Sequence, residues 1–347
     1  MTKDSDSTIQ RKKDHIDLCL TDEVNFRDKT NGFDKYDFKH YAITEVKKDN
    51  IDFTTTFFEK KINYPFLISC MTGGTAEAEN INARLATAAH ELNIPIGVGS
   101  QRLMLENKDY HLSYQIIRRK APSIPLLGNI GASQLVKMDN FDQIQFIIDL
   151  IEADGLIIHL NAAQELLQSK GEPDFTGLLK KLEKLAKKVN VPIIVKEVGA
   201  GISKKVAEKL LEAGIIGIDV AGAGGTSWTA VEILRSNEIS NSSFWDWGLP
   251  TSYCKREVSK LKKKHNFILI GSGGINTPID MAKAFALGAD IAASARMILQ
   301  VLDKSSVSGV NDTIIGWFEV IKKIMFLTGS NNMNELRNNI ILKEKLY

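Results

Sequence analysis

Polar and glycine-rich segments follow a series of short apolar runs along the chain. They contain the residue types that bind phosphate groups, metal ions and cofactors: glycine with its open backbone amides, hydroxyl and amide side chains, basic groups and single carboxylates. Because one such segment follows each of eight apolar runs, packing alone does not explain the pattern, and we expect one ligand site. The segments are residues 71–74, 100–102, 129, 159–165, 196–197, 222–226, 271–274 and 294–296.

The last two segments are typical of a phosphate site. The sequence GSGGI at residues 271–275 follows the seventh run, and Ser294 and Ala295 follow the eighth. Backbone N–H groups of such loops bind phosphate, and glycine allows the close approach that this requires. Glycine-rich turns can also serve only to close a loop, but the position after the last two runs favours phosphate binding.

Lys196 ends an apolar run, so its ammonium group is expected to face the site, where a buried charge needs an anionic partner. The electron-rich N1/O2 edge of a flavin is one such partner. A simple ion pair with the adjacent Glu197 is the alternative, although neighbouring residues of a strand point to opposite sides.

Two further groups suit a second, diphosphate ligand. Arg11, Lys12 and Arg102 can bind phosphate oxygens, although a basic run near a chain end is more often a solvated tail. Glu165 offers a hard oxygen ligand for Mg2+, with the diphosphate supplying others. A glutamate at a helix start is also commonly a cap or dipole partner, so the metal role depends on its neighbours.

The elements that must position these residues alternate between short apolar runs and amphipathic stretches. Eight consecutive strand–helix units without a long reversal favour a single-domain (β/α)8 TIM barrel over an open sheet. Active sites of such barrels lie at the carboxyl ends of the strands, where the polar segments stand. We expect strands at residues 66–70, 96–99, 125–128, 155–160, 193–196, 216–220, 267–271 and 291–294.

The expected organisation is an N-terminal arm over residues 1–40 and a barrel over residues 41–347. Residues 226–262 form the longest interruption and are expected to place a loop and helical insertion over the barrel mouth. Its tryptophans, Trp228, Trp245 and Trp247, either cover an apolar ligand or pack beneath the loop. The final residues are expected to form helices that seal the barrel.

The composition excludes several other classes of protein. Of 347 residues 44% are apolar, and 44 Lys and Arg nearly balance 42 Asp and Glu, which argues against a nucleic-acid binder. No apolar run approaches the roughly 18 residues of a membrane span, and the start is not a secretory signal, so we expect a cytoplasmic protein. Cys19, Cys70 and Cys254 lack a CxxC spacing, which predicts reduced thiols.

The chain resembles the type 2 isopentenyl diphosphate isomerases along nearly its whole length. The shared motifs, in order, are RKxxH, MTGGT, GSQR, GNIGA, HLNAAQE, KEVGAG, GAGGTSW and GSGGI. The resemblance implies FMN as the cofactor of the barrel, with NADPH as its reductant, and FMN contacts at Ser69, Met71, Thr72, Ser100, Asn129, Lys196, Thr226, Gly273, Gly274, Ile275, Ser294 and Ala295. It assigns the substrate to Arg11, Lys12, His15, Ser100, Gln101, Arg102, His159, Asn161 and Gln164, and Mg2+ to Glu165.

The implied reaction converts isopentenyl diphosphate to dimethylallyl diphosphate by a 1,3-allylic proton shift. Protonating an unactivated alkene needs a well-placed acid and an electron-rich partner, which reduced FMN can supply, and Gln164 is the catalytic candidate for the opposite proton transfer. Family members are homotetramers or octamers, so association is expected.

Two alternatives remain open. One is an FMN-dependent 2-hydroxy acid oxidase or dehydrogenase, which pairs a histidine with an arginine after a late strand, whereas residues 221–226 are AGAGGT. The other is a non-catalytic barrel that binds a flavin or an isoprenoid phosphate.

Overall fold

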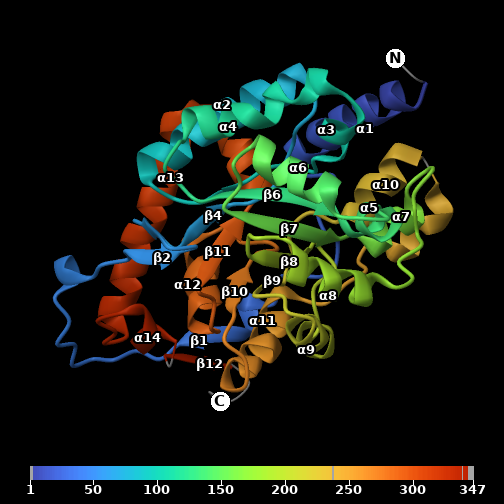
Figure 1. Cartoon of the computed structure of the whole chain (residues 1–347). Helices are drawn as coiled ribbons and strands as arrows, with labels where there is room; N and C mark the ends of the chain where they lie inside the picture. Colours follow the sequence, from blue (N-terminus) through green and yellow to red (C-terminus); the bar gives the residue numbers. More distant parts are fainter. Residues whose placement is uncertain (1–2, 237, 338, 343–347) are drawn as a thin grey trace.

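The computed structural model describes residues 3–236, 238–337 and 339–342. Within them, parallel strands form a closed barrel in chain order, and β11 returns to pair with β4 (Figure 1). Each strand overlaps one expected segment, so the predicted TIM barrel is confirmed. The barrel strands are β4 (Phe66–Ile68), β5 (Ile96–Gly97), β6 (Leu126–Gly131), β7 (Gly155–Leu160), β8 (Ile193–Glu197), β9 (Gly217–Asp219), β10 (Ile268–Gly271) and β11 (Ile291–Ser294).

Helices connect the strands and cover the outside of the barrel. Three of them begin at a hydroxyl N-cap, since Thr75, Ser203 and Thr277 each accept a hydrogen bond from the backbone N–H three residues later. The covering helices are α2 (Ala76–Leu92), α4 (Leu112–Lys120), α6 (Asp142–Leu150), α8 (Leu178–Lys188), α9 (Lys204–Glu212), α11 (Thr251–Ser259), α12 (Pro278–Ala286) and α13 (Arg296–Leu327). Shorter helices α3 (Arg102–Glu106), α5 (Ala132–Lys137) and α7 (Ala162–Leu167) begin close to the ends of β5, β6 and β7.

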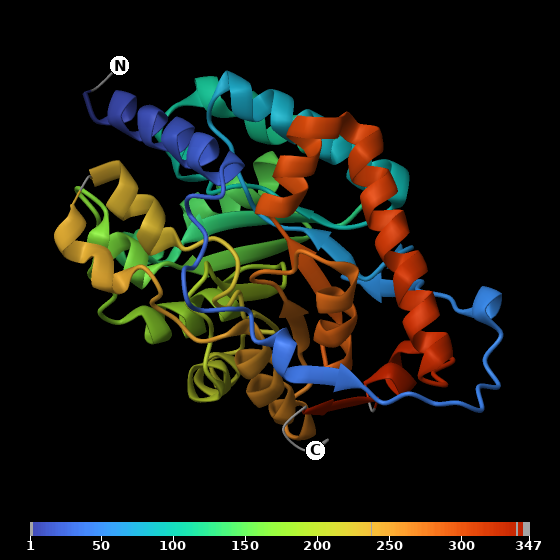
Figure 2. The same ribbon diagram turned by 180° about the vertical axis from the view of Figure 1, so that it is seen from behind.

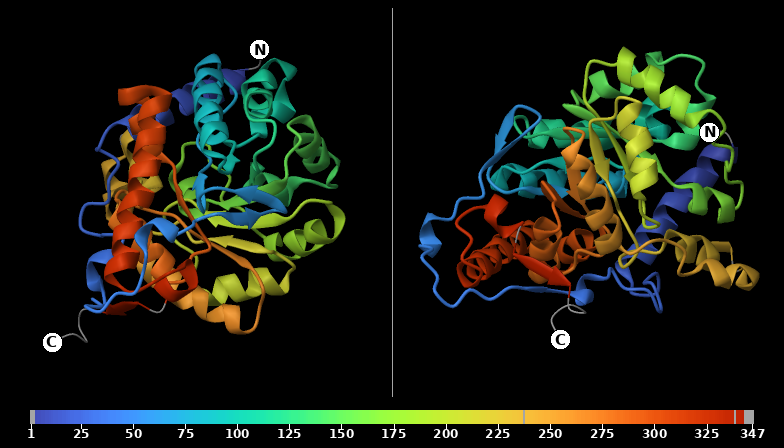
Figure 3. Two further views of the ribbon diagram at one scale, coloured as in Figure 1. Left: turned by 90° about the vertical axis from the view of Figure 1, so that its left-hand side faces the viewer. Right: turned by 90° about the horizontal axis from the view of Figure 1, so that it is seen from below.

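A hairpin closes the amino end of the barrel, and the terminal helix, which we expected to seal the barrel, packs against the helices on its outside. The strands of the hairpin are β2 (Thr55–Phe57) and β3 (Lys60–Ile62). Phe57 and Ile62 are buried with the inward-facing residues of the barrel, such as Ile157. Figure 3 shows the hairpin across this end, and Figure 1 shows α1 and α10 at the opposite end. The hairpin thus leaves the carboxyl end of the strands as the end where a ligand site can form.

The N-terminal arm is anchored to the rest of the chain at both of its ends. Helix α1 (Lys3–Leu20) contacts α10 (Trp228–Ser236) and α13 at the barrel mouth. Strand β1 (Tyr36–Phe38) pairs in antiparallel fashion with β12 (Ile340–Leu342), as Figure 2 shows at the bottom of the view. The arm is thus part of one folded unit, and the division at residue 40 stays a prediction.

The expected insertion over residues 226–262 is shorter than predicted. Helix α11 contacts α9 and β10 and is the barrel helix that precedes β10, so the insertion comprises α10 and the 3-10 helix η4 (Ile239–Phe244). Of the three tryptophans, Trp228 lines the cavity described below, Trp245 is buried against α10, and Trp247 is 57% exposed. Among the described residues, no helix combines the length and apolar character of a membrane span.

Candidate active site

A cavity of about 270 Å³ opens at the carboxyl end of the strands, under α1. Strand-end loops, the arm and Trp228 line it. The structure brings together every predicted contact residue except Gln101: Arg11, Lys12, His15, Ser69, Met71, Thr72, Ser100, Arg102, Asn129, His159, Asn161, Gln164, Glu165, Lys196, Thr226, Gly273, Gly274, Ile275, Ser294 and Ala295.

Gln101 lies outside the cavity, which corrects its expected contact with substrate. Its side chain is fully buried, and its Nε2 donates to Ile147 O at 2.9 Å. Its Oε1 accepts a hydrogen bond of 2.8 Å from Asn129 N. The residue therefore orders the backbone under Asn129, a neighbouring strand residue, and its side chain does not line the cavity.

The loop after β10 forms a glycine cradle, residues 272–274, at the edge of the cavity. Gly273 and Gly274 have φ angles of +97° and +71°, in the left-handed region that favours glycine. A Cβ on Gly273 would lie 2.3 Å from Gly222 O, and one on Gly274 would lie 2.3 Å from Gly224 O. Side chains are excluded here, so the loop backbone can approach phosphate oxygens closely.

Three polar atoms of cavity-lining residues have no hydrogen-bond partner among the described residues, namely Ser69 Oγ, Asn161 Oδ1 and Arg296 Nη1. Arg296 is held through Nη2, which donates to Asn25 Oδ1 at 2.6 Å and to Asp22 Oδ1 at 3.1 Å. A buried hydroxyl or guanidinium N–H without an acceptor is costly, and a phosphorylated ligand would supply one. These residues fit a group such as FMN. Arg296 belongs to the segment 294–296 that the sequence places in the ligand site, although no particular ligand was assigned to it.

Lys196 and Glu197 point in different directions, as expected for neighbouring strand residues. Lys196 lines the cavity, and its Nζ donates to Glu197 O at 2.6 Å. The Glu197 carboxylate instead accepts hydrogen bonds of 2.6 to 2.8 Å from the backbone N–H groups of residues 198–200. Glu197 therefore orders its own loop, and the Lys196 ammonium remains available to an anionic or electron-rich ligand.

His159 is neutral in the folded chain. Burial and the nearby charge of Lys196 lower the pKa of His159 to about 3. Asn129 Nδ2 donates to Val98 O at 3.1 Å, so Asn129 Oδ1 must accept the 2.8 Å bond from His159 Nδ1. The proton thus sits on Nδ1, and Nε2 is a hydrogen-bond acceptor.

Hydrogen bonds from the Lys12 side chain hold α1 against the barrel of the same chain. Lys12 Nζ donates to Gly73 O, to Ser100 O at 3.3 Å and to Tyr114 Oη at 3.0 Å. These acceptors come from the loops after β4 and β5 and from α4, so a single side chain joins the arm to three parts of the barrel. Burial and the adjacent charge of Arg11 lower the pKa of Lys12 to about 7.

The cations of the arm lie close to Arg102, and this concentration favours an anion. Burial and the charge of Arg102 lower the pKa of Arg11. Arg102 itself is held by Glu106, with Nε to Oε1 at 3.1 Å, and by Glu172 at 3.5 Å. A diphosphate bound among these groups would relieve the repulsion between them and replace the water that burial removes.

Glu165 is the predicted magnesium ligand, and its carboxylate is already ordered. Oε1 accepts from Asn161 Nδ2 at 2.9 Å, and Oε2 accepts from Glu172 N at 2.8 Å. Among the described residues, no group of three His, Cys, Asp or Glu side chains is placed to hold a metal ion. One carboxylate suits Mg2+ only when a diphosphate and water complete its shell, so the site fits a metal that arrives with the substrate.

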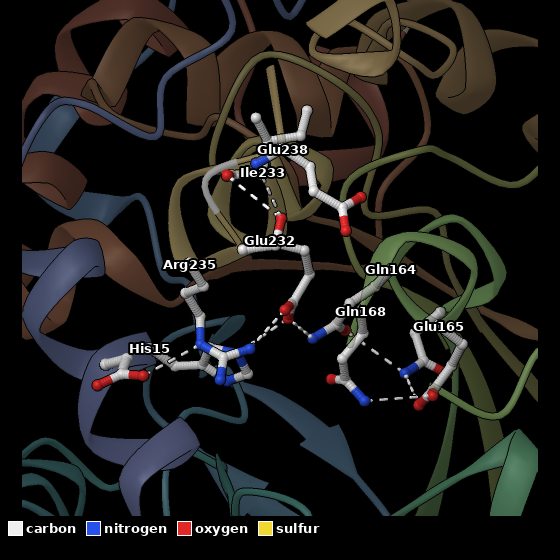
Figure 4. Close-up of polar contacts among 11 residues, drawn as sticks. His15, Gln164, Glu165, Gln168, Glu232, Ile233, Arg235 and Glu238 are labelled. Atoms are coloured by element: carbon white, nitrogen blue, oxygen red, sulfur yellow. Dashed lines mark hydrogen bonds and ion pairs between the residues drawn. The ribbon is translucent and has the colours of Figure 1, made fainter. Parts of the chain in front are cut away.

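A buried carboxylate that we did not assign from the sequence lies beside Gln164. Glu232 of α10 accepts hydrogen bonds from Gln164 Nε2 at 3.0 Å and from His15 Nε2 at 2.9 Å (Figure 4). Arg235 pairs with it at 2.6 Å and also with Asp14 at 3.3 Å. The one available signal was a glutamate in the middle of the mainly apolar stretch TAVEIL.

Comparison with known proteins supplies the family. Residues 6–107 and 153–343 match the FMN-dependent dehydrogenase family. An isopentenyl-diphosphate delta-isomerase of Pelodictyon phaeoclathratiforme is 42% identical over 349 residues, covering 96% of this chain and 97% of that protein. One from Nostoc sp. is 44% identical over 343 residues, covering 97% of this chain and 96% of that protein. The chain belongs to the isopentenyl-diphosphate delta-isomerase family.

Membership in this family makes the chain an enzyme of an FMN-dependent barrel group and disfavours both the oxidase and the non-catalytic alternatives. Solved structures agree on the fold. A flavocytochrome b2 mutant aligns with a TM-score of 0.69 at 19% identity, covering 95% of this chain and 83% of that one. A mandelate oxidase mutant aligns with a TM-score of 0.66 at 15% identity, covering 94% of this chain and 95% of that one. At such identities the likeness shows the barrel and not the reaction.

Proposed function

We propose that the chain interconverts isopentenyl diphosphate and dimethylallyl diphosphate by a 1,3-allylic proton shift, with reduced FMN and Mg2+. One observation carries the proposal: a single cavity contains the glycine cradle and Lys196 together with the cationic arm and the buried amide of Gln164. This arrangement has donors for two phosphorylated molecules, which a hydroxy acid oxidase with one small acid substrate does not need.

Reduced FMN, when bound, supplies an electron-rich ring and an exchangeable proton next to the substrate. The cradle at Gly273 and Gly274, with Ser294, would hold its phosphate. Lys196 would face the N1/O2 edge, and Asn129, already oriented by Gln101 and His159, would contact the ring system.

The arm and its neighbours bind the reactive substrate. Arg11, Lys12 and Arg102 would bind the diphosphate oxygens, and Glu165 would hold a Mg2+ ion that neutralises diphosphate charge. These contacts are made with the diphosphate and not with the double bond. Their binding energy therefore positions a small hydrocarbon group that has no polar atoms of its own for the protein to bind. Helix α1 and Trp228 exclude water, which would otherwise capture a tertiary cation. Gln164 would assist the proton transfer at the carbon from which hydrogen is lost.

The direct test incubates the purified protein with isopentenyl diphosphate, MgCl2 and FMN that dithionite has reduced, and follows dimethylallyl diphosphate by chromatography. We expect turnover, with no net consumption of reductant. Parallel samples with oxidised FMN or with EDTA should be inactive. Oxygen uptake with a 2-hydroxy acid, and no isomer, would instead support the oxidase interpretation.

We further propose that NADPH reduces the flavin in the cell and that the protein is a cytoplasmic homotetramer or homo-octamer. Stopped-flow bleaching of FMN absorbance by NADPH tests the first statement. Light scattering of the purified protein tests the assembly, and a monomer would contradict it.

A further inference from the structure

Glu232 is a buried carboxylate where α1, α7 and α10 meet, outside the strand-end segments. Only 1% of its side chain is exposed. Its Oε1 accepts hydrogen bonds from His15 of the arm and from Gln164 of α7, and its Oε2 accepts the 2.6 Å bond from Arg235 Nη1 (Figure 4). A buried carboxylate is costly unless it is paired and hydrogen-bonded, so this cluster depends on all three donors.

The charge state of Glu232 decides what it can do. Burial alone would raise the pKa of Glu232, but the hydrogen bonds from His15 and Gln164 and the charge of Arg235 outweigh burial, and its pKa lies below the ordinary value. Burial lowers the pKa of His15, so the ring donates as a neutral imidazole. At neutral pH Glu232 is therefore ionised and can only accept hydrogen bonds.

An acceptor-only neighbour fixes the amide of Gln164. With Nε2 directed at Glu232, Gln164 Oε1 lies on the side of Asn161 Nδ2, at 3.4 Å. Rotating the amide by half a turn would place its oxygen against the carboxylate, losing a charge-assisted bond and adding repulsion. The carbonyl oxygen, and not the NH2 group, is therefore the end of Gln164 that is free of the carboxylate.

We propose that Glu232 is a positioning residue for the isomerisation: it holds the Gln164 amide with its carbonyl oxygen available to the substrate, and through His15 it links that amide to the docked arm. The inference rests on the proposed function. The link between the Gln164 amide and the arm follows from a single oxygen atom, because Glu232 Oε1 accepts hydrogen bonds from both His15 and Gln164. The Asp14–Arg235 pair adds a second connection between α1 and α10. Docking of the helix that carries Arg11 and Lys12 thus also sets the orientation of Gln164.

A double-mutant cycle tests this role. We would measure kcat, KM and FMN affinity for the wild type, Glu232→Gln, Gln164→Ala and the double variant. Glu232→Gln should lower kcat by about 100-fold, the loss expected from a misplaced reacting group, and leave FMN affinity unchanged. In the Gln164→Ala background the same substitution should change kcat by no more than about twofold, because the group through which Glu232 acts is gone. Glu238→Gln is the matched control, since Glu238 is exposed beyond the end of the same helix and contacts Asn241 instead.

The results distinguish a positioning role for Glu232 from a purely structural role and from failure of the proposed function. Multiplying losses in the double variant, or a kcat for Glu232→Gln equal to that of the control, would overturn the positioning role. If Glu232→Gln melts well below the wild type, Glu232→Asp takes its place in the cycle, because it keeps the charge opposite Arg235 while withdrawing Oε1 from Gln164. If the wild type itself forms no dimethylallyl diphosphate, the proposed function fails and takes this inference with it.

Discussion

Replacing Gly273 with alanine should weaken FMN binding sharply while leaving the barrel folded. At a φ of +97° an L side chain is strained by about 1 to 2 kcal/mol. The new Cβ would also lie 2.3 Å from Gly222 O and 2.5 Å from Gly222 N, which are backbone atoms that cannot rotate aside. The loop must therefore move by about 1 Å to reach ordinary contact distances, which displaces its amides from the phosphate. Losing one bond to a charged group costs about 1.5 to 3 kcal/mol, or roughly 10- to 150-fold in the FMN dissociation constant.

The assay is a titration of flavin fluorescence, with urea unfolding measured in parallel. Gly177→Ala is the matched control, because Gly177 has a similar φ of +79° and nothing within 4 Å of a built Cβ. The control should lose only the conformational term, about 1 to 2 kcal/mol of unfolding free energy, and should bind FMN normally. Equal FMN affinity in the two variants would refute the assignment of the cradle to the phosphate.

Three further outcomes follow from the fold and the charges. Because the pKa of Lys12 falls from 10.5 to about 7, the folded chain binds fewer protons than the unfolded chain between these values. The stability of the wild type relative to Lys12→Met should therefore rise with pH across this window; a constant difference in melting temperature would contradict it. His159, with a pKa of about 3, should give no step in kcat/KM between pH 5 and 8, and a step lost in His159→Asn would assign that proton to it. Phe57→Ala should remove about 3 to 5 kcal/mol of unfolding free energy in urea without changing FMN affinity, and a loss below about 1 kcal/mol would place the ring outside the core.

The barrel and the location of its site were predictable because they follow from local patterns. Each strand is a short apolar run, and the residue after the run is brought to the rim by the topology alone. Glycine at positions 273 and 274 is visible in the sequence and has a backbone meaning that does not depend on distant contacts. The residues that the family resemblance assigns to FMN all line this cavity, and their contact with FMN stays a prediction.

The sequence-based predictions were wrong where the direction of a side chain depends on the path of the backbone. Gln101 lies in a rim segment next to Ser100, yet the chain turns there and sends its amide under the neighbouring strand, to Ile147 O. The pattern of apolar residues that marks a strand does not predict such a turn. The hairpin at residues 55–62 was missed because each of its strands has three residues, too few for a periodicity. The hairpin closes the barrel by packing Phe57 against inward-facing barrel residues, and this long-range contact is not visible in the local sequence.

The two halves of the cavity are held by different interactions, and this explains why the sequence reveals one better than the other. The half that we propose binds FMN consists of residues at the strand ends and of the backbone of residues 272–274, which the closed sheet fixes, so its geometry exists as soon as the barrel folds. The half that we propose binds substrate depends on side chains of separate helices, with Lys12 reaching the loop backbone and His15 reaching Glu232. Those contacts form only when α1 docks, and Gln164 shares one of them. FMN should therefore bind largely independently of the arm, whereas substrate affinity and the orientation of Gln164 should change together, since both depend on the same docked helix.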